Sequence, residues 1–340
     1  MKREAQHQWF ARAGYGMMAH WGLYSLLGGE YRGKRVPSYA EWIQSAMAIP
    51  NREYEQLAKA FMPVYFNADE WIRLARDAGM KYFVFTAKHH DGFAMFRSRA
   101  DSYNVADATP FGRDVTAELG EACYKYGIPF GLYYSQELDW HHPHGGGYDR
   151  TEPCAGISWD NSWDFPDRAQ KNFSVCFEEK IRPQVQELLT GYGELCLMWF
   201  DVPHTITPAQ SLELNRMVRK YQPRCLINSR IGNGAYDYVS LDDNEYPDRR
   251  PEKPMETDPN GLSGFKVSPY DLYETPGTMN SSWGFRYYDQ NWISPETIAE
   301  RRKKLNSMGI NYLLNVGPDG LGRIPSFCRE NLLRAVPLFE

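Results

Sequence analysis

Glu194-Leu-Cys-Leu-Met-Trp-Phe-Asp201 is an apolar run that ends in a carboxylate. Gly193 precedes it and Pro203 follows it closely, as expected for a parallel strand buried on both faces. Asp201 would then stand at the carboxyl end of the strand, with Trp199 two residues earlier on the same face. In (β/α)₈ barrels, active sites are built from such strand ends. The alternative is that Asp201 only caps the loop or helix that follows.

The chain contains seven more strand-like runs, with helical patterns between them. The eight runs are 15–21, 82–89, 130–135, 195–201, 226–229, 238–243, 271–275 and 312–316. This alternation predicts an α/β protein with a parallel sheet, and eight repeats predict an irregular (β/α)₈, TIM-like barrel. We expect the barrel to occupy residues 1–340 as a single domain without an accessory domain. We expect it to be irregular around 247–264, which is rich in Pro, Gly and charge.

The helical segments carry recognisable start and stop signals. Asn67 predicts the N-cap of one helix, and Gly79 predicts its end. Pro183 is expected to bend or break a longer helical stretch over 167–190. The other expected helices span 113–126, 208–221 and 295–308, with a last one starting at Pro325.

Bulk composition excludes several classes of protein. A net charge of −5 with both signs dispersed argues against nucleic acid or an anionic membrane as a partner. No apolar run is long enough to span a bilayer. Residues 1–7 are polar and lack the apolar region of a secretory signal, so we expect a cytoplasmic protein. Six widely spaced cysteines without a Cys-x-x-Cys pair are typical of core thiols.

The carboxyl ends of the predicted strands concentrate polar and aromatic side chains. They carry His20-Trp21, Lys88-His-His-Asp91, Tyr133-Tyr-Ser135, Trp199 with Asp201, Ser229-Arg230, Asp242-Asp-Asn-Glu245 and Glu274. Polar groups around aromatic faces, together with two carboxylates, are what sugar recognition and glycoside cleavage require. An aromatic content of 15% fits surfaces on which sugars stack, although aromatic residues of the core explain it equally well.

A metal site is the main competing interpretation of the histidines. His89 and His90 are adjacent and point to opposite sides of an extended backbone, so they cannot easily share one ion. His142 and His144 have a ligand-like spacing, but they lie beside the Gly-rich stretch 145–147. We therefore expect neither a metal nor a cofactor.

Motifs along nearly the whole chain, in order, resemble the retaining α-L-fucosidases of glycoside hydrolase family 29. The matching blocks are His20-Trp-Gly-Leu-Tyr-Ser25, Tyr39-Ala-Glu-Trp42, Lys88-His-His-Asp-Gly-Phe93, Tyr133-Tyr-Ser-x-x-Leu-Asp-Trp140, Trp199-Phe-Asp201, Asn228-x-Arg230, Glu274 with Trp283-Gly284, and Leu313-Leu-Asn-Val-Gly-Pro318. The family fold is an irregular (β/α)₈ barrel, usually followed by a C-terminal β-sandwich. This sequence resembles the barrel alone.

The resemblance implies roles for individual residues. Asp201 matches the nucleophile that forms a covalent glycosyl-enzyme. Glu274, in Tyr273-Glu-Thr275, matches the acid/base of many members; Glu245 is the second choice, and Glu137 or Asp243 come after it. The positions that match contacts to the fucose hydroxyls, ring or methyl group are His20, Glu41, Trp42, His89, His90, Tyr134, Trp199 and Arg230. The implied substrate is a fucosylated oligosaccharide or glycoconjugate. We expect Asp201 to be kept charged by donors such as Arg230 or a histidine.

The sequence departs from the family beside the nucleophile. Val202 and Pro203 stand where a glycine usually follows, which should stiffen the loop and narrow the leaving-group side. Two other functions stay open: a catalytically silent fucose-binding barrel, and a barrel glycosidase for a related sugar such as galactose. A homo-oligomer is compatible with the sequence, which does not fix the oligomeric state.

Overall fold

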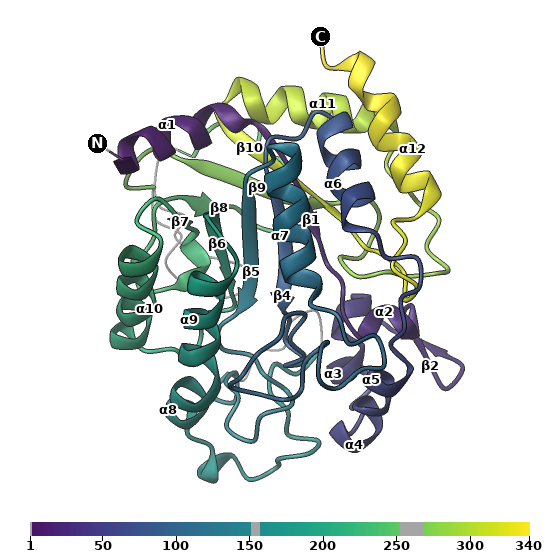
Figure 1. Ribbon diagram of the computed structural model, residues 1–340, viewed down its shortest axis with the longest axis vertical. Helices are drawn as coiled ribbons and strands as arrows, with labels where there is room; N and C mark the ends of the chain where they lie inside the picture. The colour runs from purple at the N-terminus through teal and green to yellow at the C-terminus, as the bar shows by residue number, and fades with distance from the viewer. Residues whose placement is uncertain (1, 151–156, 252–267) are drawn as a thin grey trace.

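The computed structural model describes residues 2–150, 157–251 and 268–340, which form a parallel barrel surrounded by helices (Figure 1). Its strands are β1 (Tyr15–Ala19), β4 (Phe83–Lys88), β5 (Phe130–Ser135), β6 (Leu195–Asp201), β7 (Leu226–Ile227), β8 (Val239–Ser240), β9 (Tyr273–Thr278) and β10 (Ile310–Val316). They pair in the order β7-β6-β5-β4-β1-β10-β9-β8, and every neighbouring pair is parallel. A parallel bridge between Asn228 and Tyr238 joins the two outermost strands. The predicted irregular (β/α)₈-like barrel is therefore confirmed.

The irregularity lies where β7 and β8 meet. Each of these strands has only two residues, shorter than the predicted runs 226–229 and 238–243. Of the stretch 247–264 that was expected to be irregular, residues 252–264 lie outside the described residues. Strand β9 was expected to end at Thr275 but continues to Thr278.

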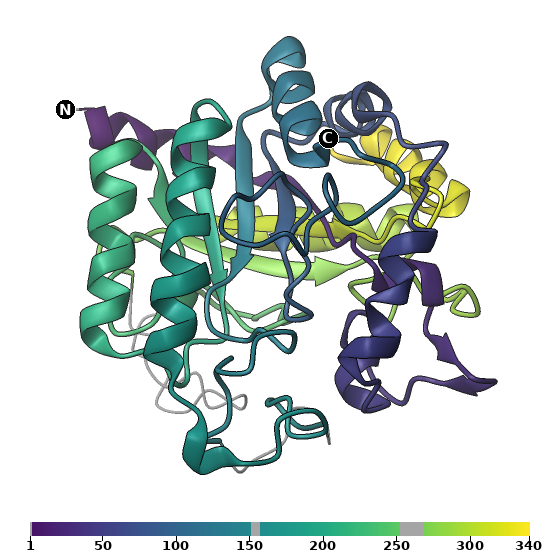
Figure 2. The same ribbon diagram turned by 60° about the horizontal axis from the view of Figure 1, so that its bottom comes forward.

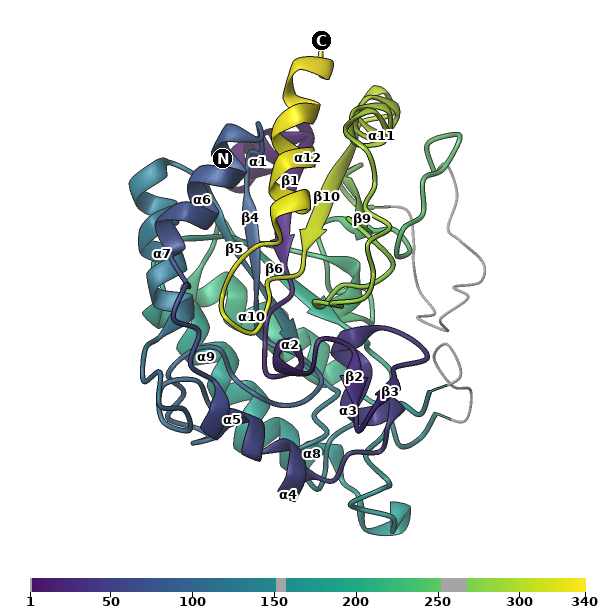
Figure 3. The same cartoon turned by 90° about the vertical axis from the view of Figure 1, so that its right-hand side faces the viewer.

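Helices lie around the barrel wall and at its two ends (Figure 1). They are α1 (Lys2–Ala13), α2 (Tyr24–Leu27), α3 (Ile43–Ala46), α4 (Asn51–Tyr54), α5 (Gln56–Ala60), α6 (Ala68–Asp77), α7 (Val115–Tyr126), α8 (Phe173–Cys176), α9 (Arg182–Gly191), α10 (Pro208–Tyr221), α11 (Pro295–Ser307) and α12 (Ser326–Ala335). Helices α11 and α12 pack together outside β10 (Figure 3). None of the helices in the described ranges is long and apolar enough to cross a membrane.

The capping signals read from the sequence are present. The Asn67 side chain accepts from the backbone N–H of Glu70 at 3.2 Å and starts α6. Pro208 and Pro295 open α10 and α11, as predicted. The stretch 167–190 is interrupted earlier than expected: a short 3₁₀ turn ends at Gln170, and a π-helical turn over Phe177–Ile181 precedes Pro183.

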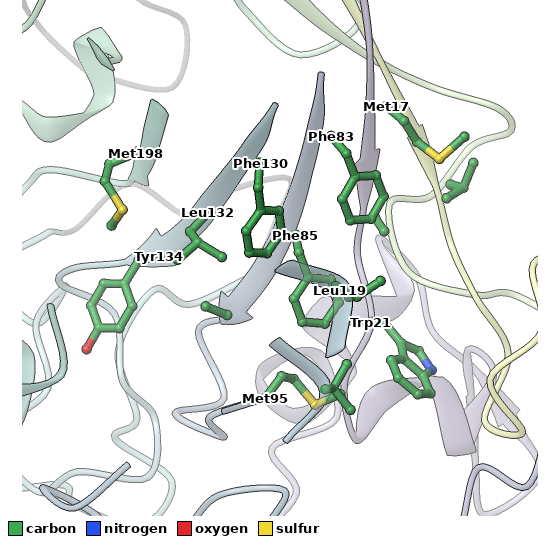
Figure 4. Packing of buried hydrophobic residues seen from close by; sticks show 14 of the residues in the cluster. Met17, Trp21, Phe83, Phe85, Met95, Leu119, Phe130, Leu132, Tyr134 and Met198 are labelled. Atoms are coloured by element: carbon green, nitrogen blue, oxygen red, sulfur yellow. The ribbon is translucent and has the colours of Figure 1, made fainter. Parts of the chain in front are cut away.

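Side chains that alternate along each strand build two separate cores. Outward-facing residues such as Phe83, Leu132 and Met198 pack against the helices (Figure 4). Inward-facing residues, among them Val84 and Trp199, fill the barrel. This period-2 alternation lets the chain bury both faces of one sheet.

Helix α1, which was not predicted, closes the amino end of the barrel. Phe10 packs against Tyr238 with ring centroids 4.5 Å apart, and its carbonyl accepts from the Asn311 side chain at 2.8 Å. Gly16 on β1 leaves room for the Tyr82 ring, because a Cβ at position 16 would lie 2.4 Å from that ring. The amino end is therefore filled by side chains.

The carboxyl ends of the strands lead into longer segments that gather at one edge of the barrel. Helices α2 to α5 and the hairpin of β2 (Glu30–Tyr31) and β3 (Lys34–Arg35) follow β1. Figure 2 brings this edge forward, with these purple and blue segments opposite the teal and green helices α9 and α10. Five of the six cysteines are buried free thiols, and Cys154 lies outside the described residues.

Candidate active site

Asp201 is the last residue of β6 and stands at the carboxyl edge of the barrel. The Tyr133 hydroxyl donates to its Oδ2 at 2.8 Å, and Arg230 Nη1 donates to its Oδ1 at 3.1 Å. His90 Nε2 lies 3.8 Å from the same Oδ2. The carboxylate is thus held at both oxygens while 9% of the residue stays exposed.

Burial and the neighbouring donor side chains act in opposite directions on the pKa of Asp201. Burial raises the pKa of its carboxyl above the ordinary value, whereas the Arg230 guanidinium and the Tyr133 hydroxyl lower it. The backbone is braced as well, because the Asp201 N–H donates to Gln136 Oε1 at 2.7 Å. Arg230 and Tyr133 stand where donors to Asp201 were expected, but burial outweighs them and leaves the pKa of Asp201 raised, so its charged state stays a prediction.

A second carboxylate shares the same arginine. Asp243 follows β8, and its Oδ1 accepts from Arg230 Nη2 at 2.6 Å. Its side chain is 29% exposed, and its negative charge raises the pKa of Asp201. Arg230 lies in the short turn Ser229–Ile231 after β7, with its guanidinium 4.7 Å from the Trp199 ring centroid. The rim therefore holds two carboxylates joined by one cation.

Glu274 does not stand at a strand tip, contrary to the sequence-based expectation. It is the second residue of β9, four residues before the end of that strand. Its Oε1 accepts from Trp199 Nε1 at 2.8 Å, and its Oε2 accepts from the Tyr82 hydroxyl at 2.7 Å. Burial raises the pKa of this carboxyl to about 7. Both oxygens are engaged in the barrel interior, which does not favour an acid/base role at the rim.

The other glutamates considered from the sequence are engaged in loops. Glu245 Oε2 accepts from the Asp242 backbone N–H at 3.2 Å, so it stabilises its own turn. Glu137 Oε2 accepts from the backbone N–H groups of His204 and Ile206 at 2.6 and 2.9 Å. Glu137 thereby holds the loop that follows the nucleophile candidate.

Three histidines gather around the carboxylates. His20 and His89 lie edge to face with centroids 5.4 Å apart, and the His89 and His90 rings are 4.0 Å apart. Burial lowers the pKa of all three, to about 4 for His20. The cluster is therefore neutral near pH 7, and each ring offers one donor and one acceptor.

Glu41 and Trp42 come from the segment after β3 and complete the cluster. Glu41 Oε2 accepts from Gly284 N at 2.8 Å and from Ser282 Oγ at 3.2 Å, whereas its buried Oε1 has no partner among the described residues. Burial raises the pKa of Glu41 to about 7. Trp42 packs edge to face on His90 with centroids 5.0 Å apart. A carboxyl with one free oxygen suits a ligand hydroxyl.

Tyr134, expected to contact the substrate, faces the opposite side of β5. Its hydroxyl donates to Gln184 Oε1 on α9 at 2.8 Å, and its ring belongs to the outer core (Figure 4). Tyr133 takes the inward position and stacks on Trp199 with centroids 5.4 Å apart. The expectation for Tyr134 is wrong because neighbouring residues of a strand point to opposite faces.

A buried ion cluster that sequence reasoning missed supports the site from behind. Lys88 and Lys180 both contact Asp139 Oδ2, at 3.2 and 2.9 Å. Burial opposes ionisation of Asp139, but the two ammonium groups outweigh it and hold the pKa of the carboxyl well below its usual value. Lys88 also donates to the Leu138 carbonyl at 3.2 Å. The cluster ties the loop after β5 to the end of β4, next to His89.

Val202, which replaces the usual glycine, adopts a left-handed backbone with φ of +58°. A β-branched residue is strained in this region. Its side chain is 5% exposed and belongs to an apolar cluster with Trp42, Trp140 and Trp159. The chain thus keeps the conformation that a glycine would adopt and adds an apolar side chain beside Asp201.

The donor set does not suggest a metal centre. Within the described ranges, no group of three His, Cys, Asp or Glu side chains is arranged to hold an ion. A barrel whose rim carries two neighbouring carboxylates among tryptophans, tyrosines and neutral histidines is instead typical of a glycoside hydrolase.

Comparisons with known proteins agree with this class. The family model described as alpha-L-fucosidase matches residues 1–336. The chain is 56% identical to the unliganded alpha-L-fucosidase AlfC from Lactobacillus casei, with a TM-score of 0.91 and 98% of each chain covered. An AlfC variant in complex with Fucα(1,6)GlcNAc matches at 55% identity and a TM-score of 0.89, again over 98% of each chain.

A more distant similarity extends to animals. The tissue alpha-L-fucosidase of Mus musculus is 28% identical over 96% of this chain, which spans 68% of that protein. The chain belongs to the alpha-L-fucosidase family and is a glycoside hydrolase. This membership favours fucose over galactose as the sugar at the site.

Proposed function

We propose that the protein releases terminal α-L-fucose by a retaining double displacement, with Asp201 as nucleophile and Asp243 as general acid and base. The observation that carries the proposal is the single guanidinium of Arg230, which contacts both carboxylates. Retaining glycosidases need two carboxyl groups about 5 to 5.5 Å apart. One arginine that binds a carboxylate with each terminal nitrogen holds the two groups at short range.

The proposed nucleophile is oriented before the substrate arrives. Tyr133 and Arg230 fix the carboxylate, and Gln136 fixes the backbone of Asp201. Arg230 counteracts the rise in the pKa of Asp201 that burial causes, which favours the ionised form. An ionised carboxylate can attack the anomeric carbon, form the covalent glycosyl-enzyme and stabilise the positive charge that develops in the transition state.

The proposed acid and base is more accessible than the alternatives. Asp243 retains 29% exposure, whereas Glu274 is completely buried. In the first step Asp243 gives its proton to the glycosidic oxygen as the bond to the leaving group breaks. In the second step it takes a proton from the water that attacks the anomeric carbon. Glu274 as acid/base stays a prediction that its position does not favour.

We further propose that the substrate is an α-linked fucosyl-N-acetylglucosamine or a glycan that ends in one. Support comes from the similarity to the AlfC variant that binds Fucα(1,6)GlcNAc. His20, Glu41, His89 and His90 would bind the hydroxyls of fucose, with Trp42 and Trp199 packing against the sugar. The apolar Val202 beside Asp201 would line the leaving-group side.

The stereochemical course of the reaction tests this proposal. Proton NMR of fresh enzyme with an aryl α-L-fucoside should show α-L-fucose before mutarotation produces the β-anomer. Asp201→Ala should remove turnover, and azide should restore release of the aryl group with formation of β-L-fucosyl azide, because the small anion fills the space of the carboxylate. Initial formation of β-L-fucose would exclude the double displacement. Near-normal turnover by Asp201→Ala would exclude Asp201 as the nucleophile.

A further inference from the structure

His20 is linked to a buried asparagine on the neighbouring strand. His20 Nδ1 and Asn315 Oδ1 are 2.7 Å apart, and Asn315 Nδ2 donates to the Trp283 carbonyl at 2.7 Å. A carbonyl oxygen only accepts, so the amide NH₂ of Asn315 must face Trp283 and its oxygen must face the histidine. This orientation requires His20 Nδ1 to carry a hydrogen and to donate it.

The ring is neutral, which fixes its other nitrogen. Burial lowers the pKa of His20 to about 4 and outweighs the hydrogen bond to Asn315 and the charge of Asp243, which raise this pKa. The charge of Arg230 also lowers it. The other titratable groups against the ring are His89, whose pKa is also lowered, and the neutral Tyr133. A neutral imidazole has one N–H only. Because Nδ1 holds it, Nε2 is a lone-pair acceptor.

That acceptor has no partner in the described part of the chain. Among the residues that the structure describes, the His20 side chain makes its only hydrogen bond through Nδ1. His89 provides the contrast, since its buried Nδ1 has no hydrogen-bond partner within the described ranges. The described residues therefore leave His20 Nε2 free to accept from a bound sugar.

We propose that Asn315 is a positioning residue that holds His20 in its Nδ1–H form, so that Nε2 recognises the sugar by accepting a hydrogen bond from one of its hydroxyls. This inference rests on the proposed fucosidase function for the identity of the sugar, but not for the tautomer. The tautomer of His20 determines the direction of that hydrogen bond, with the sugar hydroxyl as donor and Nε2 as acceptor. A fluorine in place of the hydroxyl cannot donate and should be rejected, although it is of similar size.

The free enzyme tests the tautomer directly. In ¹⁵N-histidine NMR, the resonance that disappears in His20→Gln should show a protonated Nδ1 and an unprotonated Nε2 in wild type. A protonated Nε2 would overturn the proposal. No substrate is present in this measurement, so its failure is separate from a failure of the fucosidase assignment, which the anomer of the released sugar reports.

Asn315→Asp tests the consequence for turnover of an aryl fucoside. A carboxylate beside Nδ1 favours imidazolium and raises the pKa of His20, and the protonated Nε2 can no longer accept. The pH profile of kcat/KM should gain a new acid limb, with about a tenfold loss for each pH unit below the raised pKa and recovery above it. Loss that is independent of pH would show a purely structural role and overturn the proposal.

Asn311→Asp is the matched control. Asn311 lies on the same strand and is also buried, but it accepts from Gly14 N and donates to the Phe10 carbonyl, away from the histidines. This variant should add no acid limb. If both variants gained the same acid limb in kcat/KM, general destabilisation would explain the limb, and the role of Asn315 would be overturned.

Discussion

Arg230 donates to the Asp201 carboxylate at 3.1 Å with one terminal nitrogen and uses the other to bind Asp243. The proposed nucleophile and acid are thus connected through a residue that follows a strand of only two residues, β7. Gln136 holds Arg230 in place, because its Nε2 donates to the Arg230 backbone carbonyl at 2.8 Å. Gln136 also accepts from the Asp201 N–H, so its side chain sets the position of Asp201 relative to Arg230.

Arg230→Gln should move the acid limb of kcat/KM to higher pH. The guanidinium lowers the pKa of Asp201, so its removal lets burial raise that pKa further, and the nucleophile is protonated over a wider acid range. The expected shift is about 1 to 3 pH units, measured with an activated aryl fucoside. Arg219→Gln is the control, because Arg219 pairs with Asp237 elsewhere. An unmoved limb in Arg230→Gln would contradict the electrostatic role.

Glu274→Gln should reduce the loss of stability as pH rises. The pKa of Glu274 is about 7 in the folded chain against an ordinary value of 4.5, so the group favours folding fully below pH 4.5 and loses this contribution up to about pH 7. The variant should gain up to about 3 kcal/mol relative to wild type between pH 4.5 and 8 in urea unfolding. The exposed Glu121→Gln is the control, and equal pH dependence in wild type and Glu274→Gln would refute the prediction.

Asp139→Asn should destabilise the protein strongly. It leaves the completely buried Lys88 without its countercharge, which typically costs about 3 to 5 kcal/mol in the free energy of unfolding. Asp69→Asn, which breaks an exposed pair with Lys125, should have little effect. Similar unfolding midpoints for the two variants would show that the buried cluster is not a stabilising element.

Val202→Gly should cost less stability than the same change at an ordinary position. Both Val202 and Val84 are buried, but only Val202 has a left-handed backbone. Relief of this strain should offset about 1 to 2 kcal/mol of the lost packing, so Val84→Gly should be the more destabilising variant by that amount. Equal losses would mean that the surroundings of Val202 impose no strain on the valine.

The barrel could be predicted because its local signals agree with one another. The Asn67 cap, the apolar run before Asp201 and the helix starts at Pro208 and Pro295 each fix an element without reference to distant residues. Helix α1 carries no comparable signal. Its place depends on Phe10 and Asn311, whose contact spans nearly the whole chain.

Glu274 was expected at a strand end because the predicted run stopped at Thr275, just before Pro276 and Gly277. In the structure β9 continues through both of them, paired with β10. The pairing with β8 covers only Tyr273 and Glu274. The missing N–H of Pro276 would point to the β8 side, where its carbonyl accepts from Asn244. A strand tolerates proline where its neighbour has ended, and only tertiary structure shows where that is.

Tyr133 and Tyr134 show a second limit. The sequence places both at the same strand end, and either could face the barrel interior. The face is set by the register of β5 with β6, in which Tyr133 lies opposite Trp199. The resemblance identified the motif, whereas the alternation of the strand decided which tyrosine binds Asp201.

The leaving-group dependence of Asp243→Ala tests the central claim most directly. With kcat/KM measured on an activated aryl fucoside and on Fucα(1,6)GlcNAc, the account predicts a loss about 10²- to 10⁴-fold greater on the disaccharide, because only its poor leaving group needs a proton from Asp243. Glu245→Ala and Glu274→Gln should lack this selectivity. Equal losses of Asp243→Ala on both substrates, or a selective loss in either glutamate variant, would contradict the assignment of Asp243.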